Sequence, residues 1–72
     1  MNTVSRIVVF RNNFRDREKQ LALLRKHGAT VTGVFSILNA IAVELAANAE
    51  GELTRAPEVV RIDSNERVVE AL

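Results

Sequence analysis

Few side chains in this 72-residue chain could do nucleophilic or acid-base chemistry. Such catalysis needs a nucleophile, a base and an oxyanion-stabilising donor brought together. The hydroxyl, imidazole and carboxyl groups considered for these roles are those of Ser5, Ser36, Ser64, His27, Asp16 and Asp63. No serine stands in a G-x-S-x-G nucleophile elbow, and His27 falls at the end of a predicted helix, where an exposed position favourable to the helix dipole explains it. We therefore expect no catalytic residues and no enzyme activity.

Metal and cofactor sites have no better support in the sequence. The chain has no Cys and a single His, so the usual zinc ligand sets are missing. The carboxylate pairs Glu50/Glu52 and Glu66/Glu70 lack the further converging oxygens that hard cations require. The glycine-containing loops match no phosphate-binding motif. We expect no metal and no cofactor.

The charge balance argues against a polyanionic partner. Ten basic and nine acidic residues are interspersed along the chain and leave a formal net charge of +1. A sheet can bind RNA through exposed aromatic side chains, but this chain has three Phe, no Tyr or Trp and no RNP-like motif. No apolar run approaches the roughly 18 residues that span a bilayer. We expect neither a nucleic acid nor a membrane as partner.

Strand and helix patterns alternate along the chain. Residues 6–10 (RIVVF), 30–37, 40–45 and 58–63 have the β-branched or alternating apolar pattern of strands, and Gly33 indicates a bulge or a close backbone approach. Residues 14–27 have helical periodicity, with Asn13 as the N-cap and Gly28 as the residue that ends the helix. A second, weaker helix is predicted over residues 47–55, before Pro57.

This order predicts an α+β domain of the ferredoxin-like β-α-β-β-α-β type, with two helices on one face of a four-stranded antiparallel sheet. Residues 1–72 form a single domain with a globular part at 5–65 and an extended C-terminal tail at 66–72. Both faces of the first strand are apolar, so we expect a partner protein on the face that the helices leave uncovered. The residues expected on that face are Ile7, Val9, Val31, Phe35, Ala40 and Ala42.

The ordered set of segments resembles the propeptide domain of subtilisin-like serine proteases, a family that also includes free-standing subtilisin inhibitors. The resemblance is carried by RIVVF, KHGATVTGVFSILNAIAVEL and LAANAEGELTRAPEVVRIDSN, and it extends over residues 5–72. It implies a noncatalytic domain that acts as an intramolecular chaperone for its protease and then inhibits it. It also implies a secreted or extracellular precursor, whose signal peptide is not in this chain.

The resemblance assigns roles to the residues at the end of the chain. Asp63 and Asn65 match the positions that cap two surface helices of the protease, where unsatisfied N–H groups favour an acceptor, and Asn65 replaces the usual acid. The tail would occupy the protease active site as a cleavage product does, through Val69, Glu70, Ala71 and Leu72.

The expected partner is the mature domain of a subtilisin-like protease, and the free domain is expected to be a monomer. Two alternatives stay open. One is a stand-alone subtilisin inhibitor, and the other is a ferredoxin-like regulatory or RNA-binding module. The second alternative predicts a function that does not depend on residues 69–72.

Overall fold

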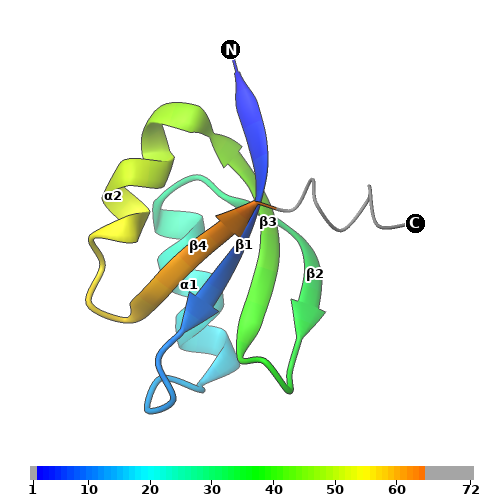
Figure 1. Ribbon diagram of the computed structural model, residues 1–72, viewed down its shortest axis with the longest axis vertical. Helices are drawn as coiled ribbons and strands as arrows, with labels where there is room; N and C mark the ends of the chain where they lie inside the picture. The colour runs from blue at the N-terminus through cyan, green and yellow to red at the C-terminus, as the bar shows by residue number, and fades with distance from the viewer. Residues whose placement is uncertain (1, 65–72) are drawn as a thin grey trace.

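The computed structural model describes residues 2–64, which form one antiparallel sheet with two α-helices against it (Figure 1). The strands are β1 (Thr3–Phe10), β2 (Thr30–Phe35), β3 (Ala40–Ala46) and β4 (Val59–Ser64). The helices are α1 (Arg17–Lys26) and α2 (Glu50–Thr54), and a short 3-10 helix, η1 (Ala47–Ala49), precedes α2. The sheet order is β2-β3-β1-β4. The predicted α+β architecture is confirmed.

The hydrophobic core lies between the helices and one face of the sheet. Leu24 of α1 and Leu53 of α2 are both fully buried there. The strands supply alternate residues to the same cluster, which are Val8, Phe10, Ile41, Val43, Leu45 and Val59. Both helices therefore cover the same face, as predicted. Within residues 2–64 no helix lies against the opposite face, which we call the open face (Figure 1).

Helix α1 begins at Arg17, whereas the sequence pattern predicted a start at residue 14 and an N-cap at Asn13. The N-cap is Asp16, whose carboxylate accepts hydrogen bonds from the backbone N–H groups of Glu18 (3.0 Å) and Lys19 (3.3 Å). These N–H groups have no partner within the helix, so the cap stabilises its first turn. Phe14 lies in the loop before the helix, with its ring 5.6 Å from that of Phe10.

The end of α1 agrees with the prediction. Gly28 has a φ of 75°, in the left-handed region. Its N–H donates to the Arg25 carbonyl (2.9 Å), and the N–H of Ala29 donates to the Leu24 carbonyl (3.0 Å). This pair of bonds is the Schellman arrangement, which satisfies carbonyls that the last helical turn leaves free.

Replacing Gly28 or Gly51 with Ala should change the free energy of unfolding in opposite directions. Gly28→Ala should lower the free energy of unfolding by about 1 kcal/mol, because a residue with a Cβ is disfavoured at positive φ. Gly51→Ala should raise it by about 0.5 kcal/mol, because Ala favours a helix and loses less backbone entropy on folding. Gly51 lies within α2, and an added Cβ would meet no atom within 4 Å. Urea denaturation measures both changes, and a stabilised Gly28→Ala variant would contradict the helix ending described above.

A β-bulge in β2 changes which residues face the helices. Val31 pairs with Val43, and the next pair joins Gly33 to Ala42, so Thr32 is an extra residue beside the predicted bulge position. Residues paired across antiparallel strands share a face, so Val31 lies on the helix side with Val43. The prediction that Val31 belongs to the open face is therefore wrong. Strand β2 also ends at Phe35, not at residue 37.

Candidate protein-binding face

The open face carries three rows of side chains that cross the strands, as the cross-strand pairs define them. The rows are Phe35–Ala40–Val9–Arg61, then Gly33–Ala42–Ile7–Asp63, then Thr30–Glu44–Ser5. The apolar centre of the face comes from β1, β2 and β3, and the charged side chains lie on β4 and toward the end of β3. The structure thus brings together Ile7, Val9, Phe35, Ala40 and Ala42 of the predicted surface.

These apolar residues differ in how far a partner could reach them. Ala40 and Ala42 are buried, with exposed fractions of 2% and 4%, whereas Phe35 is 39% exposed. Ile7 and Val9 are half-buried. The face is therefore low where Ala40 and Ala42 lie, and Phe35 is the most exposed of its large apolar side chains.

Asp63 lies at the β4 edge of the open face, paired with Ile7 across the strands. Its carboxylate accepts hydrogen bonds from Nε of Arg61, at 3.0 Å to Oδ2 and 3.3 Å to Oδ1. The Arg61 and Asp63 side chains are 63% and 47% exposed, and an ion pair so open to water contributes at most about 1 kcal/mol. The Asp63 carboxylate can therefore exchange Arg61 for another donor at little cost.

Asn65 and the tail residues lie outside the part of the chain that the structure describes. They are the second predicted capping residue and the predicted active-site residues Val69, Glu70, Ala71 and Leu72. Their roles stay predictions. Ser64 is the last residue that the structure describes, and β4 is described up to it.

The side chains considered for catalysis lie in separate places. Ser36 Oγ accepts a hydrogen bond from Nη2 of Arg17 (3.2 Å), and His27 Nδ1 lies 3.9 Å from a Glu52 carboxylate oxygen. Between residues 2 and 64, no group of three or more His, Cys, Asp or Glu side chains could hold a metal ion. No helix in the same range is long and apolar enough to cross a membrane.

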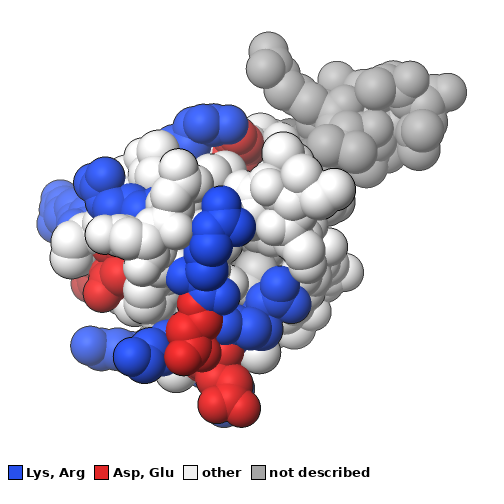
Figure 2. Space-filling view, turned by 90° about the horizontal axis from the view of Figure 1, so that it is seen from below, with Lys and Arg blue, Asp and Glu red and all other residues white. Residues whose placement is uncertain are grey.

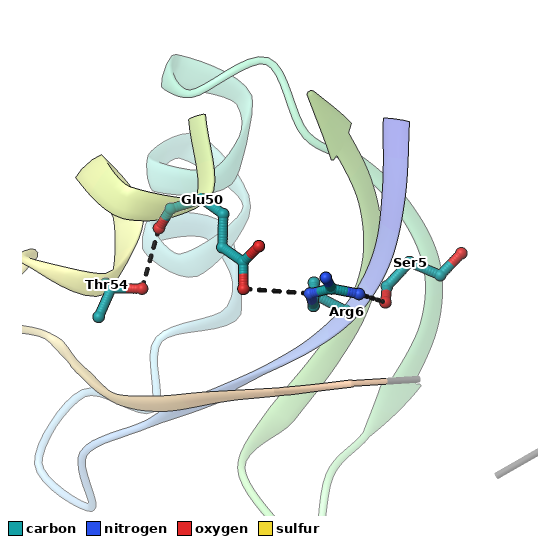
Figure 3. Close-up of polar contacts among 4 residues, drawn as sticks. All are labelled: Ser5, Arg6, Glu50 and Thr54. Atoms are coloured by element: carbon teal, nitrogen blue, oxygen red, sulfur yellow. Dashed lines mark hydrogen bonds and ion pairs between the residues drawn. The ribbon is translucent and has the colours of Figure 1, made fainter. Parts of the chain in front are cut away.

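Arg6 and Glu50 connect the sheet to α2, a contact that the sequence analysis missed (Figure 3). Nε of Arg6 donates to Oε2 of Glu50 (3.0 Å), and Nη1 of Arg6 donates to the Ser5 carbonyl (2.8 Å). The Thr54 hydroxyl donates to the Glu50 carbonyl (2.9 Å) within the helix. Arg6 lies two residues before Val8, so both side chains are on the helix side of β1. The period of the strand could therefore have predicted that Arg6 points toward the helices. The pair holds α2 against the covered face, away from the open face.

A buried amide pair, Gln20 and Asn39, joins three segments and was also missed. Nε2 of Gln20 donates to the Phe14 carbonyl (2.7 Å) and to Oδ1 of Asn39 (2.9 Å). Nδ2 of Asn39 in turn donates to the carbonyls of Arg11 (2.7 Å), Phe10 (3.3 Å) and Phe14 (3.3 Å). The exposed fractions are 2% for Gln20 and 7% for Asn39. The pair fixes the β2–β3 turn against the end of β1 and the start of α1.

No protein-family model matches this chain, and no curated protein is significantly similar to it. The function is therefore inferred from the open face and from the order of segments in the chain.

Proposed function

We propose that this chain is the propeptide domain of a subtilisin-like serine protease, which assists the folding of the protease and then inhibits it. The observation that carries the proposal is the open face, an apolar surface with a carboxylate at the edge from which the chain continues. A protein packed on this face would contact both the apolar centre and the Asp63 carboxylate, and in sequence the proposed inhibitory residues 69–72 follow Asp63 closely.

The residue types on the open face suit a partner that presents helices. A sheet buried on both faces has a layer of helices on each side, and this domain supplies only one of the layers. Gly33, Ala40 and Ala42 keep the centre low, so that a helix of the partner could approach the strands closely. The N-terminus of such a helix has unsatisfied N–H groups and a partial positive charge, both of which a carboxylate such as Asp63 stabilises.

The tail adds the inhibitory part of the proposal. Val69 and Leu72 are apolar, Glu70 is polar and Ala71 is small. An extended peptide that adds a strand to the edge of a binding cleft places some side chains in pockets and leaves others toward solvent, and these residue types suit that mode. Leu72 would fill an apolar pocket, and the small Ala71 would lie close to the catalytic centre of the protease. In this proposal the tail occupies the cleft as a cleavage product does.

Titration of the 72-residue chain against an active subtilisin, with a chromogenic peptide as substrate, tests the proposal. We expect competitive inhibition, together with faster recovery of activity when the denatured protease is refolded in the presence of the domain. Inhibition without any effect on refolding would favour a stand-alone inhibitor. A chain that neither inhibits nor binds the protease would contradict both and leave a regulatory or RNA-binding module.

Replacing Asp63 with Ala should slow both complex formation and the refolding of the protease. An acceptor at a helix N-terminus contributes about 1 kcal/mol, so the association constant should fall about fivefold. Arg61→Gln is the matched control, because it removes the ion-pair partner and keeps the carboxylate. The unfolding free energy of the free domain should change by less than about 1 kcal/mol in either variant. Full chaperone activity in Asp63→Ala would reject the capping role.

A further inference from the structure

The turn between β2 and β3 displays apolar side chains that the fold does not use. We propose that Ile37 and Leu38, which we call the hairpin tip, are a second anchor for the protein that docks on the open face. The partner would bury them in an apolar depression with an acidic rim. The proposal rests on the proposed function, because it takes the subtilisin-like protease as that partner.

The exposure of the hairpin tip is its first distinguishing property. Ile37 is 95% exposed and Leu38 is 66% exposed. Of the exposed large hydrophobic residues between residues 2 and 64, all but Val60 belong to β2 or to this tip; they are Val31, Val34, Phe35, Ile37 and Leu38. Apolar surface concentrated in this way is typical of a protein-binding site.

The turn itself does not require these two side chains. The Asn39 N–H donates to the Ser36 carbonyl (3.1 Å) and closes the turn, and Asn39 has the positive φ, 53°, that a tight turn needs. Ser and Asn suit such positions, whereas β-branched and long aliphatic residues are uncommon in turns. Neither Ile37 nor Leu38 belongs to the hydrophobic core. Their presence is explained by a contact outside the domain.

The hairpin tip is also held in place. The Asn39 amide is buried among the carbonyls of the loop before α1, and the Asn39 carbonyl accepts a hydrogen bond from the Phe10 N–H (3.0 Å). A turn that is anchored through Asn39 loses less backbone entropy on binding than a freely moving loop does. A few residues that fill well-packed, desolvated pockets of the partner carry most of the affinity of a protein interface, and the proposal assigns Ile37 and Leu38 to such a pocket.

The hairpin tip adjoins the open face, so one partner protein could contact the tip and the face together. Phe35 lies in the first row of the open face beside Ala40, and it precedes the turn directly. Phe35, Ser36, Ile37 and Leu38 together line an open concavity. A protein resting on Phe35 therefore has the hairpin tip within its reach, and the tip extends the contact beyond the low centre of the sheet.

Basic side chains near the tip indicate the charge of the partner surface. Nη2 of Arg17 donates to Ser36 Oγ (3.2 Å), and Arg15 belongs to the loop before α1, where the Phe14 carbonyl accepts a hydrogen bond from Asn39. Both arginines are exposed. Figure 2, which views this end of the molecule, shows several Lys and Arg side chains among uncharged surface, together with fewer Asp and Glu side chains. Charge complementarity then requires acidic groups around the depression that receives the tip, and these would raise the association rate.

The test compares the wild-type chain with an Ile37→Thr, Leu38→Ser double variant in the inhibition titration. Because both side chains are exposed, the variant should fold, and thermal unfolding of the free domain verifies this. We expect its inhibition constant against an active subtilisin to rise at least about tenfold, as the loss of a hot spot does. Ala22→Ser, at an exposed position of α1 on the covered side of the sheet, is the control and should change the inhibition constant less than about twofold.

Arg15→Gln and Arg17→Gln should lower the association rate constant and its dependence on salt, and Lys26→Gln, at the other end of α1, should not. If the wild-type chain inhibits and the tip variant inhibits equally well, the tip proposal alone is overturned. If the wild-type chain does not inhibit, the proposed function falls and the tip proposal falls with it. Unchanged inhibition accompanied by tip-dependent dimerisation in sedimentation velocity, or by tip-dependent binding to phosphatidylserine vesicles, would also overturn it.

Discussion

Asn39→Ala should lower the free energy of unfolding by about 3 kcal/mol, a large part of the stability of so small a domain. The substitution removes the amide that donates to three carbonyls and accepts from Gln20. It thereby leaves buried polar groups without a partner, which costs roughly 1–3 kcal/mol. The φ of 53° adds a further penalty of about 1 kcal/mol, since Ala is disfavoured there.

Two further variants separate these contributions. Asn39→Gly removes the hydrogen bonds and tolerates the positive φ, so it should be less destabilised than Asn39→Ala. Asn48→Ala, at an exposed position in η1, is the control and should stay within about 0.5 kcal/mol of the wild type. Urea denaturation measures all three. A value for Asn39→Ala as small as that of the control would mean that the amide pair does not hold the turn.

A double-mutant cycle with Gln20→Met addresses the pair directly. Met has nearly the shape of Gln and no amide, so this variant isolates the polar contact. The coupling free energy between Gln20 and Asn39 should lie between about 0.5 and 3 kcal/mol, as for residues in one hydrogen-bond network. Strictly additive effects would show that the two amides act independently.

Deleting residues 69–72 should raise the inhibition constant against a subtilisin at least about tenfold, which corresponds to about 1.4 kcal/mol. In the proposed function these residues fill the active-site cleft, so the truncated domain keeps only the contacts of the open face and of Asp63. The titration with a chromogenic substrate measures the loss directly. Truncation that leaves inhibition unchanged would exclude a product-like ligand.

A variant in which residues 69–72 become a Gly-Ser sequence of equal length serves as the matched control. It keeps the length of the chain and removes the apolar side chains. If Leu72 and Val69 fill pockets, this variant should inhibit as weakly as the deletion does. If the Gly-Ser variant inhibits as well as the wild type, the backbone of the tail makes the contact with the protease, and the side chains of Val69 and Leu72 do not.

Local patterns in the sequence were sufficient for the architecture. Local sequence patterns predict β1, β3 and β4 from their apolar runs and α1 from its periodicity. Gly28 ends α1 because it has a positive φ. The short turn before β3 makes an antiparallel hairpin the simplest connection. Consequently the fold class followed from the order of elements alone.

The wrong or missing predictions concern the start of α1, the face of Val31 and the Gln20–Asn39 pair. Their outcome depends on how segments pair or pack, which local sequence patterns do not show. Asn13 and Asp16 are both good N-caps, and the structure uses Asp16 and starts the helix at Arg17, while Phe14 packs against Phe10. Strict alternation placed Val31 on the open face, but the extra residue at Thr32 moves it to the other side. Gln20 and Asn39 become partners only after the hairpin and α1 are side by side.

Strand order has a consequence for when Asp63 becomes available. β4 pairs only with β1, at the opposite end of the described chain, so closing this pair demands the largest loop in the fold. Contacts of such high sequence separation form late in folding, because their entropic cost is repaid only when the rest of the sheet exists. We therefore expect the domain to present the Asp63 carboxylate to a partner only after the whole sheet has formed. A partner that recognises this carboxylate would then bind the folded domain and not a partly folded one.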